Sequence, residues 1–182
     1  MVMSRRNDIN AGGETVYDDI LYPVDGSDGA KAAIDHVRDL AQTYDATVHV
    51  LFVAEHPELH GLAGDTDRGE GRGMAGANEG ADTGMRGSGS SSADVLAEAE
   101  ARGENVVEEV TERLGDVTTT TAVVAGTPHE AILNHAYRHD VDVVVMGTHG
   151  RTGLDRYLLG SVTEKIVRLS DAPVLTVRQH GS

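Results

Sequence analysis

Short runs of β-branched residues alternate along this chain with amphipathic stretches. The runs are Ile20–Val24, Thr47–Val53, Val117–Ala125, Val141–Met146 and Pro173–Arg178. Between them, apolar residues recur every three or four positions, a spacing typical of helices that bury one face. Strands that alternate with helices predict a parallel sheet in a doubly wound α/β domain with right-handed crossovers. The fourth run is apolar enough to be covered on both faces.

Four helices are expected between and around these strands. The first carries the apolar stripe from Ala30 to Tyr44, and the second carries the stripe from Leu96 to Leu114, interrupted by Gly103. The third opens at Pro128, with Thr127 as N-cap, and runs to about His139. The fourth covers residues 161–169.

Two stretches have too little apolar pattern to belong to the core. Residues 1–17 are expected to form a flexible tail before a single domain at 18–179. Ten of the 22 glycines lie between Gly61 and Gly89, and no Val, Ile or aromatic residue accompanies them. Such a segment cannot bury enough surface to offset its ordering entropy. We therefore expect a disordered Gly-rich insertion at about 57–92.

The charge balance limits the classes of partner. Fifteen Lys and Arg against thirty Asp and Glu give a net charge of −15, which disfavours general attraction to nucleic acid or anionic lipid. Only two of the basic residues are lysines, a composition that suggests a salt-rich, halophilic cytosol. No cysteine is present, so thiolate chemistry is excluded. No signal peptide or membrane span is recognisable, and a cytoplasmic protein is expected.

A glycine-rich stretch, Gly147–Ser161, follows the fourth strand and precedes the last helix. Glycines let the backbone approach an anion, and the free N–H groups of a helix's first turn point at it. Asp25 ends the first strand. If these two strands are neighbours, both features face the point where ligands bind in doubly wound sheets.

The spacing of this stretch is Gly, two residues, Gly, nine residues, then Gly-Ser. It resembles the nucleotide-binding signature of the universal stress protein family. Asp25-Gly26-Ser27, Gly126-Thr127-Pro128 and Ala172-Pro173-Val174 are also similar to that family's pattern. The resemblance covers roughly residues 18–178 without the insertion, and several separated motifs occur in the right order.

The resemblance implies a Rossmann-like, five-stranded sheet of order 3-2-1-4-5, ATP over its carboxyl edge, and a homodimer formed through the C-terminal strand 173–178. Any Mg²⁺ or Mn²⁺ would be carried by the phosphates, with no metal ligand from protein side chains. The residues implied on the adenine and ribose side are Pro23, Val24, Asp25, Val53 and Gly147. Those implied around the phosphates are Gly150, Arg151, Thr152, Gly153, Gly160, Ser161, Val162 and Thr163.

Two of these residues, and a pair of histidines elsewhere in the chain, also have a plainer interpretation. Ser161 begins a possible capping box with Glu164, and Asp25 could simply be a turn residue. His135 and His139 stand four apart, as metal ligands on a helix can, but solvated side chains are favoured because no third ligand is evident.

The leading hypothesis is an ATP-binding stress-response sensor or regulator. The alternative is a structural or adaptor dimer that binds no nucleotide. ATP hydrolysis ranks third, because no Walker A sequence is present and the glycine-rich stretch contains no obvious general base.

Overall fold

The computed structural model describes residues 16–55, 92–148 and 159–178. Residues 1–15 of the expected tail, residues 57–91 of the expected Gly-rich insertion and residues 149–158 lie outside these ranges. The helices are α1 (Asp28–Lys31), α2 (Ile34–Tyr44), α4 (Ser92–Leu114), α5 (Pro128–Arg138) and α6 (Ser161–Leu169). The strands are β1 (Asp19–Val24), β2 (Thr47–Ala54), β3 (Thr119–Ala125), β4 (Val143–Gly147) and β5 (Val174–Val177).

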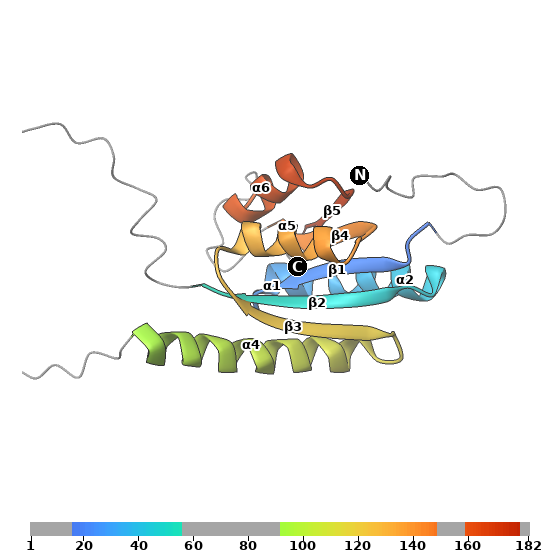
Figure 1. The fold of residues 1–182 in the computed structure, drawn as a ribbon. Coiled ribbons are helices and arrows are strands. Elements are labelled where there is room, and N and C mark those ends of the chain that lie inside the picture. Colours follow the sequence, from blue (N-terminus) through green and yellow to red (C-terminus); the bar gives the residue numbers. More distant parts are fainter. Residues whose placement is uncertain (1–15, 56–91, 149–158, 179–182) are drawn as a thin grey trace, which may run out of the picture.

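The five strands form one sheet in the order β3-β2-β1-β4-β5 (Figure 1). Every neighbouring pair is parallel. Parallel neighbours need crossover connections, and the chain supplies a helix in each described one. Both the doubly wound class and the strand order expected from the sequence are confirmed.

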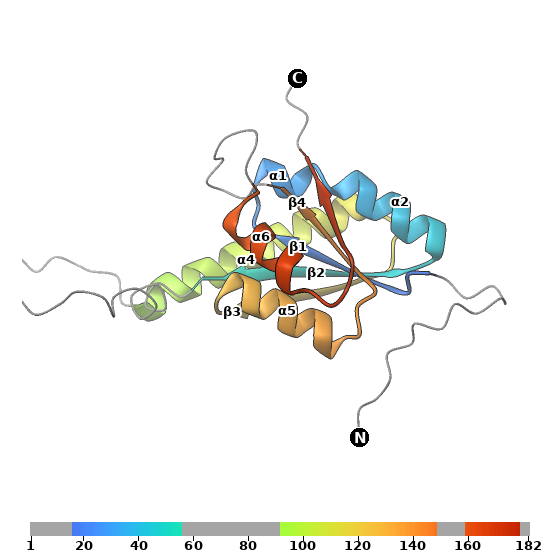
Figure 2. The same ribbon diagram turned by 90° about the horizontal axis from the view of Figure 1, so that it is seen from above.

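Two apolar clusters hold the helices against the two faces of the sheet. Alternate residues of β1 divide between them: Ile20 and Tyr22 pack with α2 and α4, whereas Leu21 packs with Ile132 of α5 and Ile166 of α6. Figure 2 shows α2 and α5 on opposite sides of the strands. β4 is buried along its whole length, as its apolar sequence predicted, because both of its faces are covered.

The expected first helix is divided into α1 and α2. In an unbroken helix, the carbonyl of Ala30 would accept from Ile34. Here it accepts from Ala33 N–H at 3.0 Å and from the hydroxyl of Tyr22 at 2.5 Å. The buried Tyr22 hydroxyl thus takes part in the break, a long-range contact that helical spacing cannot report.

The remaining elements follow their predicted positions within two residues, apart from α4, which starts four residues before its first predicted apolar position. Thr127 is the N-cap residue of α5 and Pro128 its first residue, although the Thr127 side chain makes no capping hydrogen bond. Within the described ranges, no helix combines the length and apolarity that a membrane crossing requires.

Candidate functional site

β1 and β4 are neighbouring strands at the point where the winding of the sheet reverses. The chain winds from β1 through β2 to β3, then returns to the other side of β1 to form β4 and β5. β1 is in register with β2 from Asp19 to Val24, whereas its register with β4 covers Ile20 and Leu21. Ligands of open α/β sheets bind at this reversal. The strand that ends at Asp25 and the strand that precedes the glycine-rich stretch are therefore neighbours, as the predicted site requires.

Asp25, Gly26 and Ser27 form the turn from β1 into α1. The Asp25 carboxylate accepts from Ser27 N–H at 2.9 Å, and the Ser27 hydroxyl accepts from Ala30 N–H at 3.1 Å. Gly26 has a φ of 80°, a conformation that strongly favours glycine. The turn interpretation of Asp25 is confirmed, and a nucleotide contact from the same residue stays a prediction.

Gly147 ends β4 directly against the first turn of α1. A Cβ added there would lie 2.3 Å from the carbonyl oxygen of Gly29 and 3.0 Å from the nitrogen of Ala30. The Gly147 carbonyl accepts from the hydroxyl of Thr163 at 3.1 Å, and Thr163 is only 3% exposed. Gly147 therefore links the first turn of α1 to the first turn of α6. The Thr163 hydroxyl is used inside the protein, so a phosphate contact from this residue would have to come from its backbone N–H.

The start of α6 differs from the expected capping box. Gly160 is the N-cap residue, and its carbonyl accepts from Glu164 N–H at 2.8 Å. The expectation that Ser161 could cap the helix is wrong, because Ser161 is already the first helical residue. The N–H groups of Ser161, Val162 and Thr163 precede the intrahelical ladder, as they do at any helix start. Ser161 itself is exposed.

Backbone hydrogen bonds join the two ends of the glycine-rich stretch. Gly160 N–H donates to the carbonyl of Thr148 at 2.8 Å, and Thr148 N–H donates to the carbonyl of Val177 at 2.9 Å. Gly160, the second described residue after the gap, is thus held near Thr148, the last one before it. Four predicted site residues fall within the gap and outside the described residues: Gly150, Arg151, Thr152 and Gly153.

The other predicted residues lie in β1 and β2. Pro23 and Val24 are buried at the end of β1, and Pro23 lies beyond the register with β4. Val53 is partly buried near the end of β2, where it pairs with Val124. The structure thus brings Val24, Asp25 and Gly147 to one edge, with Val53 one strand away.

One cation at this edge was not anticipated from the sequence. Arg102 on α4 donates from its guanidinium to the carbonyl of Asp25 at 3.3 Å. The neighbouring Gly103 is a buried position of α4 that faces Phe52 and Val123. A buried glycine in an otherwise apolar helical stripe indicates that the helix packs closely on the sheet at that point. Gly103 was therefore the one sign in the sequence that the neighbouring Arg102 lies close to the sheet.

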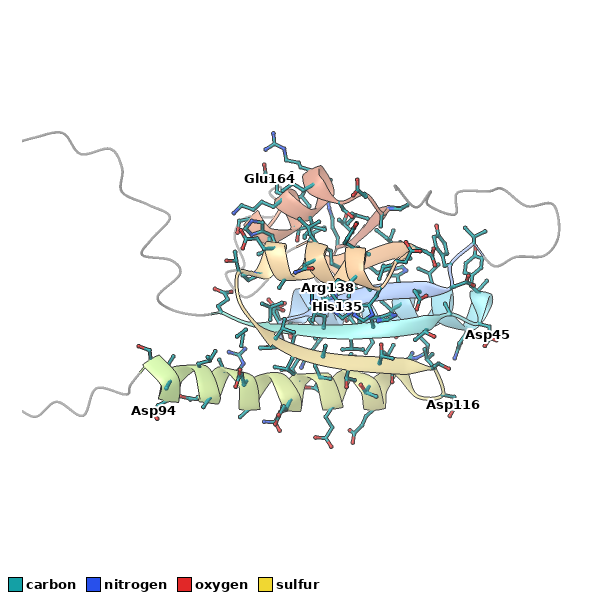
Figure 3. All side chains as sticks on the ribbon, viewed as in Figure 1. Asp45, Asp94, Asp116, His135, Arg138 and Glu164 are labelled. Atoms are coloured by element: carbon teal, nitrogen blue, oxygen red, sulfur yellow. The ribbon has the colours of Figure 1, made fainter. Side chains whose placement is uncertain are left out.

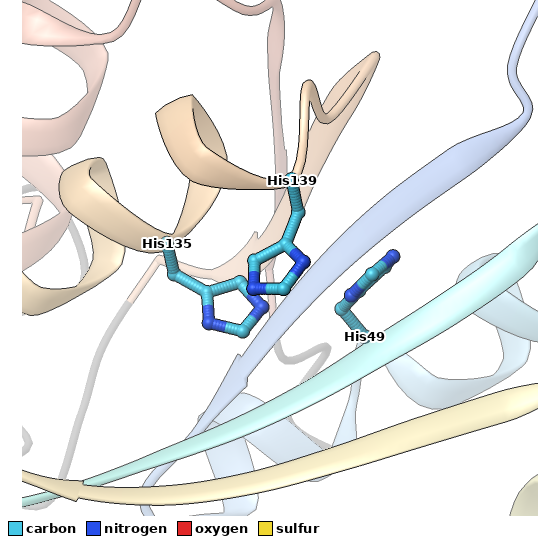
Figure 4. A group of neighbouring side chains, drawn as sticks. All are labelled: His49, His135 and His139. Carbon is cyan, nitrogen blue, oxygen red and sulfur yellow. The ribbon is translucent and has the colours of Figure 1, made fainter.

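The histidine pair on α5 is not simply solvated. His135 and His139 lie against His49 of β2, which is only 8% exposed (Figure 4). A ring nitrogen of each residue lies within 4.8 Å of those of the other two. The expectation that no third ligand is near was wrong, because strand alternation alone does not reveal which helix covers His49.

A hollow of about 580 Å³ lies elsewhere, between α4 and the edge strand β3. Its lining combines acidic side chains, among them Glu104 and Glu108, with apolar Val107 and Val123. We attach no nucleotide to it, because it lies away from the strand ends and acidic groups repel phosphates.

Comparison with known proteins gives a consistent picture. The model of the universal stress protein family matches residues 17–178. Universal stress protein MJ0531 of Methanocaldococcus jannaschii is 31% identical over 95% of this chain and 89% of its own length. Universal stress protein MJ0577 of the same organism is 31% identical over 92% of this chain and 98% of its own length.

Solved structures share the fold. That of MJ0577 superimposes with a TM-score of 0.70 at 28% identity, over 92% of this chain and 99% of that one. A universal stress protein solved in complex with cAMP has a TM-score of 0.53 at 20% identity, over 89% of this chain and 97% of its own. An Arabidopsis thaliana member with AMP bound has a TM-score of 0.55 at 16% identity, over 90% and 92%. With its fold, its strand-end geometry and these relatives in agreement, the chain belongs to the universal stress protein family.

Proposed function

We propose that this chain binds an adenine nucleotide, ATP, across the carboxyl ends of β1 and β4, and that it hydrolyses ATP slowly or not at all. It would act as a sensor or regulator of the stress response in a salt-rich cytoplasm. One observation carries the proposal. Gly147 touches the first turn of α1 through backbone atoms, while its carbonyl holds Thr163 in the first turn of α6. The turn after β1 and the helix start after β4 therefore belong to one small region.

The proposed roles follow from the chemistry of each group. The Asp25 carboxylate would accept from ribose hydroxyls beside Pro23, Val24 and Val53. The first-turn N–H groups of α6 would donate to phosphate, as helix N-termini do. Gly150, Arg151, Thr152 and Gly153 would complete the phosphate side, with any Mg²⁺ or Mn²⁺ carried by the phosphates.

Relatives that carry nucleotides support an adenine ligand. One family member was solved with cAMP and another with AMP. Both share the base and ribose of ATP, so the adenosine part of the proposal has more support than the triphosphate part. ATP, AMP and cAMP should therefore be compared in the same titration.

We also propose a symmetric homodimer through β5. This strand stands at the edge of the sheet, and unpaired edges invite another strand. Leu175 on β5 is 40% exposed, and Val167 and Leu169 on the neighbouring α6 are 46% and 60% exposed. Leu175→Lys should convert a dimer to a monomer in sedimentation measurements, whereas Tyr137→Lys, at a 78% exposed position on α5, should not.

The central experiment measures nucleotide directly. The purified protein is denatured and the released nucleotide identified by mass spectrometry; stripped protein is then titrated with ATP, AMP and cAMP by calorimetry. Binding of ATP would support a sensor if the bound ATP is released as ADP much more slowly than it exchanges with free ATP. If no nucleotide co-purifies and none binds at millimolar concentration, the proposal fails and the adaptor dimer becomes the better interpretation.

Matched variants locate the site. Asp25→Asn keeps an oxygen that can accept from Ser27 N–H, so the turn should persist while the charge is lost. A charge-assisted hydrogen bond contributes about 1.5–3 kcal/mol, so affinity should fall about tenfold or more. Asp28→Asn, an exposed neighbour in the first turn of α1, is the control. Gly150→Val should likewise weaken binding by obstructing backbone approach to phosphate.

A further inference from the structure

Three histidines from two elements meet at the amino-terminal side of the sheet. His49 is near the start of β2, His135 lies in the last turn of α5, and His139 is the residue that caps it. The ring centroids are 5.5 Å apart for His49 and His135, 5.2 Å for His49 and His139, and 4.2 Å for the stacked pair on α5. The cluster thus lies toward the amino-terminal ends of the strands, whereas the proposed nucleotide site lies at their carboxyl ends.

The helix presents its two histidines as a unit. His139 N–H donates to the carbonyl of His135 at 3.1 Å, which keeps the two residues one helical turn apart. Figure 3 places His135 on the side of α5 that faces the strands, and Figure 4 shows both rings directed toward His49. Residues four apart on a helix can share one ligand on the same face.

His135 has an unmet bonding requirement. Its Nε2 atom is buried and has no hydrogen-bond partner among the described residues, which is costly for a polar atom removed from water. Burial, followed by repulsion from His139 and His49, lowers the pKa of His135 to about 4. The unpartnered Nε2 nitrogen is an atom that a metal ion could coordinate.

His49 is held in a definite orientation by its neighbours. Its Nε2 atom lies 2.8 Å from the Asp19 carboxylate, and its Nδ1 atom lies 3.0 Å from the Thr120 hydroxyl. A carboxylate that accepts from one ring nitrogen orients the ring and makes the other nitrogen a better donor to a metal ion. Nδ1 of His49 could exchange its contact with the neutral Thr120 hydroxyl for such an ion.

We propose that His49, His135 and His139 bind a divalent transition-metal ion of the zinc class. Imidazole nitrogen suits Zn²⁺, Cu²⁺ and Ni²⁺ and is poorly matched to Mg²⁺ or Ca²⁺. Three histidines leave one position of a tetrahedral ion for water or a small ligand. The exposed His139 lies on the solvent side of the site.

The three ring nitrogens must move slightly closer together to bind one ion. Nitrogen ligands on a tetrahedral zinc ion lie about 3.3 Å apart, because each is about 2.0–2.1 Å from the metal. The present separations are within 4.8 Å, so rotation of the exposed His139 ring and a small shift of His135 would suffice. The ion would then tie the end of α5 to β2, two elements that the chain connects only through the Gly-rich stretch, α4 and β3.

The experiment uses the full-length protein, stripped of nucleotide because phosphates bind metals themselves, and of metal by chelation. The affinity and stoichiometry of Zn²⁺ binding are measured by calorimetric titration. Co²⁺ is added in a separate experiment, because its visible absorption spectrum reports a tetrahedral site. Thermal unfolding is followed with and without Zn²⁺, because an ion that binds only the folded state raises the midpoint.

Variants separate this cluster from other histidines in the chain. His139→Gln is the main test, since His139 is exposed and its replacement leaves the core intact. His135→Gln and His49→Gln are the second and third, and His36→Gln on the exposed side of α2 is the matched control.

We expect one tight equivalent of Zn²⁺, a raised unfolding midpoint and a tetrahedral Co²⁺ spectrum. His139→Gln should weaken Zn²⁺ binding at least tenfold and remove the midpoint shift, and His36→Gln should change neither. Equal affinity and equal midpoint shift in His139→Gln and wild type would overturn the proposal, as would the absence of any midpoint shift with Zn²⁺ in the wild type. Retained adenine nucleotide binding in His139→Gln would separate this site from the proposed function.

Discussion

Gly147 and Gly29 are in backbone contact: a Cβ placed on Gly147 would lie 2.3 Å from the carbonyl oxygen of Gly29. The end of β4 can approach α1 this closely because Gly147 carries no side chain. Glycine at position 147 is therefore required by packing, whether or not a ribose lies beside it.

Gly147→Ala should lower the free energy of unfolding by about 3 kcal/mol or more, the upper end of the range found for overpacked cores, because the obstructing atom belongs to the backbone and cannot rotate away. Urea unfolding checks this. Gly115→Ala is the comparison: among the described residues, and apart from its two chain neighbours, no atom lies within 4 Å of its added Cβ. Its φ is 69°, so the substitution should cost about 1 kcal/mol from backbone conformation. A Gly147→Ala protein as stable as Gly115→Ala would contradict the packing argument.

Tyr22 is a second position where a buried group supports the candidate site. Its side chain is 0% exposed and its hydroxyl donates to the carbonyl of Ala30 at 2.5 Å. Tyr22→Phe should cost about 1 kcal/mol, the usual net contribution of a neutral hydrogen bond. Tyr137→Phe, at a 78% exposed position, should leave the free energy of unfolding unchanged. Equal effects of the two substitutions would show that the Tyr22 bond contributes nothing measurable.

The same tyrosine predicts how stability changes at alkaline pH. Burial raises the pKa of Tyr22 far above its ordinary value; Arg113 opposes this, and Asp25 and Asp35 add to it. In the unfolded chain, Tyr22 would lose its proton near pH 10. Above that pH the folded state binds more protons than the unfolded state, so stability falls as pH rises. Below it, both states keep the proton and the effect vanishes.

The wild type should therefore lose stability above about pH 10 faster than Tyr22→Phe does, by up to about 1.4 kcal/mol for each further pH unit. Urea unfolding of both proteins across this range gives the difference directly, because all other tyrosines are common to the two. A constant difference from neutral to alkaline pH would mean that Tyr22 ionises normally in the folded protein.

Local sequence patterns predicted the architecture well because strand and helix periodicity is set by burial, and burial dominates this fold. Val141–Met146 indicated a strand covered on both faces, and β4 is buried throughout. The placement of Asp25 and the end of β4 at the same edge of the sheet followed from strand order alone. Contacts across the fold were harder to predict: nothing in the spacing of Ala30–Tyr44 indicates that the Tyr22 hydroxyl bonds to the Ala30 carbonyl where that helix breaks.

The histidine cluster is a second case in which contacts across the fold could not be predicted from local sequence spacing. His135 and His139 were visible as a pair four residues apart, but His49 joins them only because α5 covers one face of β2. Arg102 likewise reaches Asp25 through the packing of α4 on the sheet. Such contacts depend on which helix covers which strand, information that one sequence without a structure does not contain.

Gly103 explains how α4 comes close enough to the sheet for Arg102 to contact Asp25. A Cβ on Gly103 would lie 2.5 Å from Cδ1 of Phe52 and 2.9 Å from Cγ1 of Val123. Alanine favours helix by about 1 kcal/mol over glycine, but overpacking costs about 1–3 kcal/mol. Because a phenyl ring held in the sheet has little room to move, we expect the packing cost to prevail and Gly103→Ala to be destabilised by about 1 kcal/mol.

A double-mutant cycle with Phe52→Leu tests the cause. The smaller side chain should relieve the crowding, so Phe52→Leu should cost less in the Gly103→Ala protein than in the wild type, with a coupling energy of about 0.5 kcal/mol or more. Additive effects would place the strain elsewhere in α4. A Gly103→Ala protein more stable than the wild type would show that the helix can move away from the sheet, and in that case the contact between Arg102 and Asp25 should be lost as well.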